Sequence, residues 1–552
     1  MRTNRARLAM AGALTAITLS LVAFKDPGER YFEIAKNLDI FGTLFKEVNT
    51  YYVDEINPNE IIKTGIDAML RSLDPYTNYI PEDEIEDYLT MTTGQYGGIG
   101  AVVGPRNGKT IVVMPYENSP AQKAGLKISD EILKIDGVDL KGKSQESISK
   151  LLKGQAGTVV KLTIRRYGQN NNQDVAVARE NIKINNVPYY GMINEEVGYI
   201  ALKDFTSGAS REVKNALVEL KSKGAKKLVF DLRDNPGGLL SEAVNVSNIF
   251  VAKDAEIVST KGKVTDWNKT YTALNPPVDT EMPVVVLTSS RSASAAEIVS
   301  GVIQDYDRGV LVGQKTYGKG LVQATRSLSY NSKLKITTAK YYIPSGRCIQ
   351  AIDYTHRNDD GSAGKIPDSL RVAFKTKNGR VVYDGGGVTP DVEVARPTVP
   401  SITQGLESKN LIFDYANKYY SEHASIKPAK AFSLSDAEYQ DFVKWLGDKE
   451  YDYVTQVERN LEDLEATSKK EKYYDSIQDQ IKALRTKIFH DKDSDLQKFK
   501  TELKPLLEEE IVARYYFQKG IQEASFDNDV DVLNALGLFK DSERYQQILK
   551  GK

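Results

Sequence analysis

The sequence predicts a multidomain α/β protein that combines a layered α/β core with a β-rich domain and with helical units at both ends. Three observations support this prediction. The 552 residues exceed the usual size of one domain. Apolar strands alternate with helical runs between about residues 187 and 394. Only five of the 40 glycines lie after residue 400, where long charged amphipathic runs indicate helices.

The composition indicates a folded chain and excludes several classes of partner. Hydrophobic residues make up 41% and charged residues 27%, as in ordinary globular proteins. The 74 basic and 75 acidic residues give a net charge of −1, so we expect no nucleic-acid partner. One cysteine, Cys348, and three histidines without an HExxH motif argue against a zinc site. We therefore expect neither a metal nor an organic cofactor, and we interpret Cys348 as a packing residue.

The first 25 residues have the pattern of a signal peptide or membrane anchor. Arg2, Arg5 and Arg7 precede an uncharged run of 17 residues, Leu8 to Phe24, as a basic n-region precedes an apolar h-region. The run is shorter than the ~20 apolar residues that span a bilayer comfortably, yet no clear cleavage site follows it. We expect export to the periplasm, or membrane association at the periplasmic face of a bacterial inner membrane if the signal stays uncleaved.

Two domains are predicted before the core. Residues 30–92 place apolar side chains at three- and four-residue spacing, which predicts an amino-terminal helical domain with Asn59 as one helix cap. Residues 93–182 consist of short β-rich runs between glycine turns, with one helical stretch at residues 144–154. We therefore expect a compact β-rich domain there.

The predicted core covers residues 183–400 and carries three polar or glycine-rich turns, each delivered by an apolar strand. The turns lie within LVFDLRDNPGGLL (228–240), VVVLTSSRSASAAEIVSGVIQDY (284–306) and VGQKTYGKGLVQ (312–323). Catalytic groups are often displayed on such turns, because the strand fixes their position. Residues 401–552 are predicted to form a helical domain, whose long charged helices could mediate homo-oligomerisation or docking of adaptor proteins.

A serine at the start of a helix is a candidate nucleophile, because its Oγ lies near free backbone amides. The second turn offers Ser292 and Ser294, and the residues alone leave both open. No histidine precedes His356 and there is no GxSxG motif, so a histidine base is not indicated. A lysine made neutral by burial can replace it. Lys319, between two glycines in the third turn, is a candidate for this base.

Taken together, the three motifs resemble those of the carboxyl-terminal processing proteases, also called tail-specific proteases, over most of residues 40–395. The family's SASASE-like signature matches SASAAE at residues 292–297, and its GKGxxQ turn matches residues 318–323. The resemblance implies a serine endopeptidase with a crotonase-like layered core, in which Ser294 is the nucleophile, Lys319 the base and Gln323 the residue that orients the lysine. We also expect Lys319 and Gln323, four residues apart, to share one face of a strand.

The resemblance extends to the oxyanion hole and to the β-rich domain. It implies that the Ala295 amide and the amide of Gly237 or Gly238, from the DLRxNPGG turn, hold the oxyanion; the sequence does not choose between the two glycines. Residues 94–180 resemble a PDZ domain. In that domain we expect the amides of four residues to receive a substrate's terminal carboxylate while its tail adds as a strand; the four are Gly97, Gly98, Ile99 and Gly100.

The predicted function is thus cleavage of envelope proteins near their carboxyl ends, with PDZ recognition of exposed nonpolar tails. Two alternatives stay open: a binding protein that keeps the fold without its chemistry, and an adaptor in which the PDZ domain and long helices matter more than catalysis. The retention of Ser294, Lys319 and Gln323 favours the enzyme.

Overall fold

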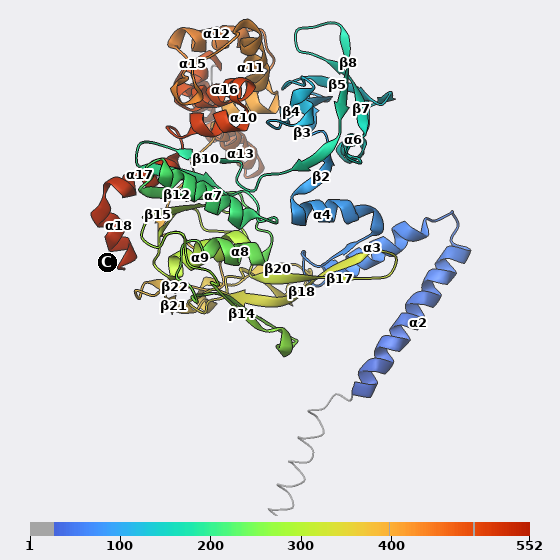
Figure 1. Cartoon of the computed structure of the whole chain (residues 1–552). Coiled ribbons are helices and arrows are strands. Elements are labelled where there is room, and N and C mark those ends of the chain that lie inside the picture. Colours follow the sequence, from blue (N-terminus) through green and yellow to red (C-terminus); the bar gives the residue numbers. More distant parts are fainter. Residues whose placement is uncertain (1–26, 397, 489–491, 552) are drawn as a thin grey trace, which may run out of the picture. The chain divides into compact units, whose positions relative to one another are not determined.

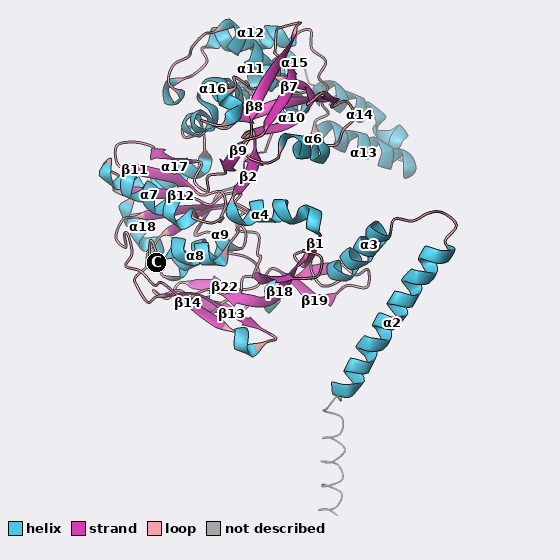
Figure 2. Cartoon of the chain, turned by 45° about the vertical axis from the view of Figure 1, so that its right-hand side comes forward, coloured by secondary structure: helices cyan, strands magenta, loops and turns pink. Residues whose placement is uncertain are grey.

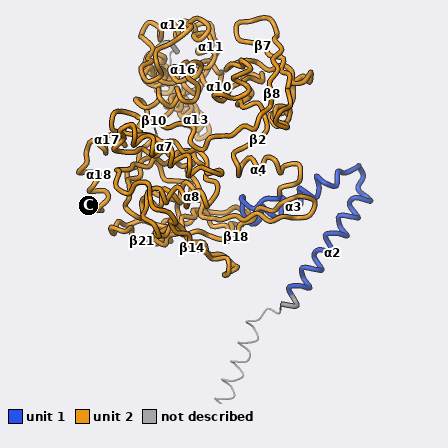
Figure 3. Tube along the Cα trace, viewed as in Figure 1, with its two compact units in different colours: residues 1–79 blue, residues 80–552 orange. Residues whose placement is uncertain are grey.

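The computed structural model describes residues 27–396, 398–488 and 492–551. It divides into two compact units, residues 1–79 and 80–552 (Figure 3). The predicted signal or anchor over residues 1–25 lies outside the described residues. Across the described ranges, no helix is both long enough and apolar enough to cross a membrane.

The first unit forms the helices α2 (Pro27–Tyr51) and α3 (Pro58–Arg71). Asn57, and not the predicted Asn59, caps α3, and its side chain accepts a hydrogen bond from the Asn59 amide. Pro58 explains the shift, because a proline suits the first helical position, where no N–H is needed. Strand β1 (Asn78–Ile80) spans the boundary between the two units.

The predicted β-rich domain forms, and its sheet has the strand order β3-β4-β5-β7-β8, with β6 beside β5. Strand β2 pairs separately with β9. Val112, Ile135, Val160 and Leu162 are fully buried in its core. The elements are β2 (Gln95–Gly98), β3 (Ala101–Arg106), β4 (Lys109–Pro115), α5 (Pro120–Lys123), β5 (Glu131–Ile135), β6 (Val138–Asp139), α6 (Gln145–Leu152), β7 (Val159–Arg165), β8 (Asn172–Ala178) and β9 (Glu180–Lys183).

The layered core is built on a sheet with the strand order β10-β11-β12-β15-β16-β23. Figures 1 and 2 label β12 of this sheet beside helix α7. Strand β10 is antiparallel to β11, and every later pair is parallel. Helix α7 connects β11 to β12 and α9 connects β15 to β16, as parallel strands require. The elements are β10 (Tyr189–Met192), β11 (Val197–Ala201), α7 (Ala209–Ser222), β12 (Lys227–Asp231), α8 (Leu240–Ser247), β15 (Val284–Thr288), α9 (Ala295–Asp305), β16 (Val310–Gly313) and β23 (Val392–Glu393).

Helices cover both faces of this sheet, which explains its continuous apolar strands. On one face, Phe230 and Val286 pack in a cluster with α7, α8 and α9. On the other face, Tyr199, Val229 and Val285 pack with residues of α17 (Val530–Lys540) and α18 (Ser542–Leu549). The alternation of neighbouring residues between the two clusters follows the two-residue period of a strand.

A second sheet lies in the core and carries the strand that follows the lysine turn. Its strands pair antiparallel in the order β17-β18-β13-β14. They are β13 (Glu256–Gly262), β14 (Lys269–Thr272), β17 (Leu321–Ser327) and β18 (Lys333–Tyr342). Two short hairpins, β19 (Ile352–Arg357) with β20 (Ala363–Lys365) and β21 (Ala373–Lys375) with β22 (Val381–Tyr383), follow before β23.

The carboxyl-terminal helices form their own apolar cluster, which includes Tyr439, Phe442 and Leu507. One predicted helical run over residues 451–489 is divided in the structure, because Lys472 has a positive φ of 65° that ends the helix. The helices are α10 (Ser401–Ser408), α11 (Leu411–Glu422), α12 (Asp436–Leu446), α13 (Gln456–Lys470), α14 (Tyr474–Ile488), α15 (Lys492–Lys498) and α16 (Lys500–Ser525).

Helices from both predicted helical domains pack on the larger unit. The predicted helical domain over 30–92 is divided after Tyr79, because α4 (Ile85–Thr93) is tied to the larger unit: the Ser207 amide donates to the Thr92 carbonyl, and the Ile184 amide to the Gly94 carbonyl. The predicted helical domain over 401–552 also contains α17 and α18, which pack on the core sheet.

Candidate active site

Ser294 is the N-cap residue of α9, as the sequence predicted from its place before a helix. It is half-buried and adopts φ 54° and ψ −113°. A non-glycine residue in this region stores about 1–3 kcal/mol of strain and persists only where its surroundings hold it. Strained residues of this kind are common at functional sites. The sharp turn exposes the side chain, as a nucleophile requires.

The structure separates Ser294 from its competitor Ser292. The Ser292 hydroxyl is fully buried, donates to the Leu232 carbonyl at 2.7 Å and accepts from the Ser289 amide at 2.9 Å. It therefore has a structural role in joining two turns. Ser294 instead stands at the start of α9, where its side chain and that of Glu297 form a capping box.

Lys319 lies in the segment between β16 and β17, and its neighbouring glycines allow close packing. A Cβ at Gly318 would lie 2.4 Å from the Ala351 Cβ, and one at Gly320 would lie 2.7 Å from the Gln350 amide nitrogen. Both glycines are buried, while Lys319 itself is half-buried. The GKG backbone thus packs closely on its neighbours, whereas the role of Lys319 as base stays a prediction.

Glu297 is the residue that joins the two candidate catalytic turns, and sequence reasoning assigned it no role. Its buried carboxylate accepts four hydrogen bonds. Oε2 accepts from the amides of Ser294 at 2.8 Å and Lys319 at 2.9 Å. Oε1 accepts from the Thr316 hydroxyl at 2.5 Å and the Gly318 amide at 2.7 Å. Burial raises the pKa of Glu297 to about 7, although the four donors act in the opposite direction.

Tyr341, at the end of β18, joins the same two turns through their carbonyl groups. Its buried hydroxyl donates to the Lys319 carbonyl oxygen at 2.7 Å and to the Ser294 carbonyl oxygen at 3.2 Å. Ser294 and Lys319 are therefore held together on both sides, at their amides by Glu297 and at their carbonyls by Tyr341. No local pattern in the sequence indicates this role of Tyr341, because only the fold brings the two carbonyl groups to its hydroxyl.

Gln323 lies on β17 and its side-chain amide donates to the Thr337 hydroxyl at 3.2 Å. The expectation that Gln323 and Lys319 share one face of a strand was wrong, because β17 begins only at Leu321. The register with β18 also shifts between Val322 and Gln323, which interrupts the two-residue period. The proposed role of Gln323 in orienting the lysine remains a prediction.

The two candidate oxyanion glycines differ in what they contact. A Cβ on Gly237 would lie 2.8 Å from the Ser294 Cβ and 2.9 Å from the Ala295 nitrogen, so this glycine packs directly on the Ser294 turn. Its own amide donates to Oδ1 of Asn235 at 2.8 Å. Gly238 instead packs on Phe205, whose carbonyl oxygen would lie 2.5 Å from an added Cβ. Both glycines are sterically required, and the choice of oxyanion donor stays open.

The candidate carboxylate loop of the β-rich domain is divided between a strand and a turn. Gly97 and Gly98 pair with Asn181 and Glu180 in the β2–β9 ladder, whereas Ile99 and Gly100 lie in the turn before β3. Beside this turn, β3 is the edge strand of its sheet, so an extended peptide could add to it. α6 flanks that edge.

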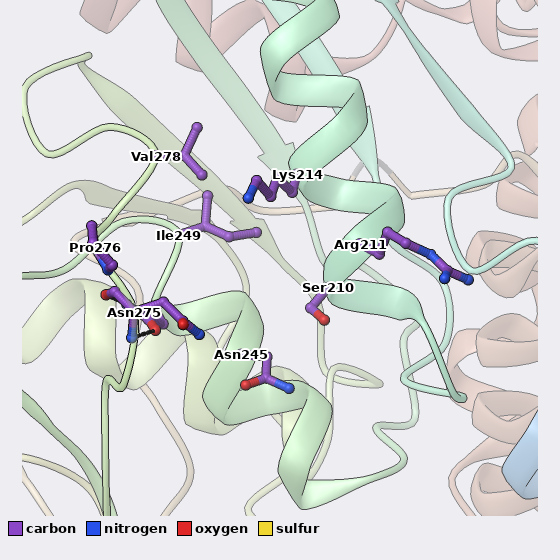
Figure 4. Close-up of a pocket in the computed structure, with 9 residues that line it drawn as sticks. Ser210, Arg211, Lys214, Asn245, Ile249, Asn275, Pro276 and Val278 are labelled. Atoms are coloured by element: carbon purple, nitrogen blue, oxygen red, sulfur yellow. Dashed lines mark hydrogen bonds between the residues drawn. The ribbon is translucent and has the colours of Figure 1, made fainter. Parts of the chain in front are cut away.

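One further lysine, whose pKa is shifted, lies in the lysine segment, whereas a pocket of the core is lined by none of the predicted site residues. The pKa of Lys315, in the same segment as Lys319, is lowered by burial and by the Arg371 charge. A pocket of about 350 Å³, shown in Figure 4, is lined by Arg211 and Lys214 of α7 and Asn245 of α8, and by none of the predicted site residues. Among the described residues, no group of three or more histidine, cysteine, aspartate or glutamate side chains could hold a metal.

Three regions of the chain match models of known protein families. Residues 196–357 match peptidase family S41, residues 97–177 match a PDZ domain, and residues 402–539 match a model described as "Probable PDZ-protease, C-terminal helical domain".

Similar proteins and solved structures have been identified. A carboxy-terminal-processing protease of Bartonella bacilliformis is 36% identical over 350 residues, which cover 63% of this chain and 80% of the relative. A CtpA-like serine protease of Staphylococcus aureus is 36% identical over 316 residues, which cover 57% of this chain and 62% of that protein. The structure of a photosystem II D1 C-terminal processing protease is 25% identical, with a TM-score of 0.35, over 67% of this chain and 95% of that one.

The family follows from the relative in Bartonella together with the domain matches. At 36% identity this relative is covered over 80% of its length, and the S41 and PDZ matches fall on the core and on the β-rich domain described above. The chain therefore belongs to the carboxy-terminal-processing proteases of peptidase family S41, and it is a serine-type peptidase with a PDZ domain.

Proposed function

We propose that this peptidase cleaves bacterial envelope proteins near their carboxyl ends with Ser294 as nucleophile, Lys319 as base and Gln323 as the group that orients the lysine. The observation that supports the proposal most directly is the double link between the two turns, through Glu297 and through Tyr341. A nucleophile and a base must stay within hydrogen-bonding reach through the reaction, and shared backbone anchors provide this.

In the proposed mechanism, the neutral Lys319 amine takes the proton from Ser294 Oγ as this oxygen attacks the scissile carbonyl. The tetrahedral oxyanion accepts hydrogen bonds from the Ala295 amide and from a glycine amide of the 237–238 turn. As the intermediate collapses, the C–N bond breaks and Lys319 returns the proton to the departing amine. Water then attacks the acyl-enzyme with the same lysine as base, which releases Ser294.

We further propose that the PDZ domain recruits substrates by their nonpolar tails, which would add as a strand to the free edge of β3 with the terminal carboxylate near the turn at Ile99 and Gly100. Strand addition supplies affinity through backbone hydrogen bonds. The basic and apolar amino-terminal run supports the bacterial envelope as the place of action.

Cleavage of a flexible protein with a nonpolar tail tests both proposals, with the same protein bearing a charged tail as comparison. We expect Ser294→Ala and Lys319→Ala to abolish cleavage and the charged tail to raise KM. Two matched controls should keep the chemistry. Ser290→Ala alters an exposed serine of the same turn, and Lys315→Ala removes another half-buried lysine of the same segment as Lys319. Cleavage by Ser294→Ala, or loss of activity in Lys315→Ala equal to that in Lys319→Ala, would refute the assigned roles.

A further inference from the structure

Arg233, in the turn that carries Gly237 and Gly238, uses all five of its side-chain N–H donors on three carboxylates. Asp231, at the end of β12, accepts from Nε at 3.0 Å and from one terminal nitrogen at 2.8 Å. Asp529 accepts from both terminal nitrogens, at 2.9 and 2.7 Å, and Asp531 accepts from one of them at 2.9 Å. The last two aspartates belong to the carboxyl-terminal segment, almost 300 residues further along the chain.

The side chains of this network are mostly buried, and the guanidinium charge is paired with the carboxylates around it. The side chain of Arg233 is 15% exposed, and those of Asp529 and Asp531 are 14% exposed each. Burial alone would raise the pKa of Asp231, yet the Arg233 charge, followed by that of Lys203, holds this pKa far below its usual range. A partner lost from such a site leaves a buried charge uncompensated, which is costly.

The carboxylates from the carboxyl-terminal segment are themselves fixed. Asp529 is the N-cap residue of α17, and its Oδ1 also accepts from the amides of Asp531 and Val532. The helix then packs on the outer face of the core sheet through Val532, Ala535 and Leu538. The position of the Asp529 carboxylate is therefore set by the sheet on which the candidate active site is built.

On its other side, the Arg233 turn reaches the nucleophile. Lys203 Nζ donates to the Arg233 carbonyl at 3.0 Å, which holds the backbone at this residue. Two residues on, the Asn235 carbonyl accepts from the Ala293 amide at 2.9 Å. Gly237 then packs against Ser294. A displacement of Arg233 would be transmitted through four residues to the turn that faces the scissile carbonyl.

We infer that Asp529 and Asp531 are positioning residues for the peptidase reaction, which hold the oxyanion turn in place through Arg233. The inference rests on the proposed function, because it takes Ser294 as nucleophile and the 237–238 turn as part of the oxyanion hole. It gives α17, which sequence reasoning placed in a helical appendage, a part in aligning the catalytic groups.

The competing explanation is that Asp529 only caps α17, and two substitutions at one position separate the explanations. Asp529→Asn keeps an equally good helix cap and removes the charge that binds Arg233. Asp529→Glu keeps the charge, and glutamate is not among the preferred caps. The matched control is Asp541→Asn, which changes the aspartate whose side chain accepts from the Arg544 amide at the start of α18.

The test uses the purified full-length protein, a short peptide substrate and a fluorophosphonate probe that labels the nucleophile. We expect the double variant Asp529→Asn/Asp531→Asn to lose kcat by about ten-fold or more, with KM changed less than about two-fold, because a single oxyanion donor is worth ~10²–10³ in rate. The rate of labelling should fall by a similar factor. Asp529→Glu should keep more kcat than Asp529→Asn, and Asp541→Asn should keep the kcat of the wild type.

Two outcomes would overturn the inference while Ser294→Ala is inactive. One is a double variant with the kcat of the wild type. The other is a loss of kcat that only parallels the loss of thermal stability. In that case Asp529 would act as a helix cap alone, and Asp529→Glu would lose more kcat and stability than Asp529→Asn. Cleavage by Ser294→Ala would instead overturn the proposed function and this inference with it, so the two failures are distinguishable.

Discussion

The substitution Glu297→Gln tests whether one carboxylate aligns the turns of the proposed nucleophile, Ser294, and the proposed base, Lys319. In the wild type above pH 7, where Glu297 is ionised, each carboxylate oxygen accepts two hydrogen bonds, Oε2 from the amides of Ser294 and Lys319, and Oε1 from the Thr316 hydroxyl and the Gly318 amide. Glutamine keeps the shape but has one NH₂ group in place of an acceptor. That group must oppose one of the two donor pairs.

The expected loss of kcat follows from the less costly of the two orientations that the introduced glutamine side chain can adopt. The Thr316 hydroxyl can turn and accept a hydrogen bond, whereas a backbone amide cannot. The NH₂ group should therefore face Thr316 and Gly318, which leaves the Gly318 amide without its acceptor, next to Lys319. A buried donor left unpaired costs ~1–3 kcal/mol. If the lysine turn shifts to relieve this cost, a loss of roughly 5- to 150-fold in kcat is expected.

The same substitution should also change how the free energy of unfolding depends on pH. The pKa of Glu297, raised by burial to about 7, lies above the ordinary value of 4.5. The native state therefore holds a proton that the unfolded state releases between pH 4.5 and 7, so this residue's contribution to stability falls as the pH rises through that window. The fall is at most about 3 kcal/mol. Glutamine does not titrate, so the stability of the variant relative to the wild type should improve from pH 5 to pH 8.

The assay combines kcat and KM for a short peptide with denaturant unfolding at both pH values. A Glu297→Gln enzyme with the kcat of the wild type would refute the role in alignment. A stability difference that does not change between pH 5 and pH 8 would refute the assignment of the raised pKa to this carboxyl group.

Three further substitutions address other contacts. Gly237→Ala should abolish cleavage, because its Cβ would lie 2.8 Å from the Ser294 Cβ. Tyr341→Phe, which removes the hydroxyl shared by the carbonyls of Ser294 and Lys319, should lower kcat by roughly 2- to 10-fold with little change in KM. Gln145→Ala should tighten binding of a nonpolar-tailed peptide by roughly 2- to 10-fold in fluorescence anisotropy, because the Gln145 side chain donates at 2.6 Å to a carbonyl of β3 that an added strand would need.

Matched controls exist for each of these variants. Gly224→Ala has a comparable positive φ of 97° but meets no atom closer than 3.9 Å, so activity equal to that of Gly237→Ala would contradict the steric argument. Tyr306→Phe removes a hydroxyl that donates to the Glu256 carbonyl, outside the site. Lys150→Ala alters the exposed, Glu146-paired side of α6, and weaker peptide binding by Gln145→Ala than by this control would contradict the competition argument.

The parts of the site that were predictable from sequence are those encoded locally. A serine before an apolar helical run predicts a helix start, and Ser294 is the N-cap residue of α9. Glycines around Lys319 predict close packing, and both glycines are in close contact with other backbone segments. The alternation of strands and helices likewise predicted the layered α/β architecture of the core.

The parts that were missed depend on contacts between distant segments. Glu297 stands at the third position of α9, where an acidic residue is common and stabilises any helix. Only the fold brings the Lys319 turn to the same carboxylate. Asp529 and Asp531 likewise have the pattern of an ordinary helix start, and nothing local indicates that Arg233 lies beside them. The face that Gln323 presents was mispredicted because the register shift in β17 depends on its pairing with β18.

The strained backbone of Ser294 links these contacts into one argument about the site. A positive φ at serine costs about 1–3 kcal/mol, and four bonds oppose relaxation: Ser294 amide to Glu297, Tyr341 and the Ile298 amide to the Ser294 carbonyl, and the Ala293 amide to the Asn235 carbonyl. Each such bond contributes ~0.5–1.5 kcal/mol net, so together they are sufficient to offset the strain. The partners lie on α9, on β18 and on the turn that contains Arg233. The geometry of the proposed nucleophile therefore depends on the packing of the whole core, and α17 belongs to that core.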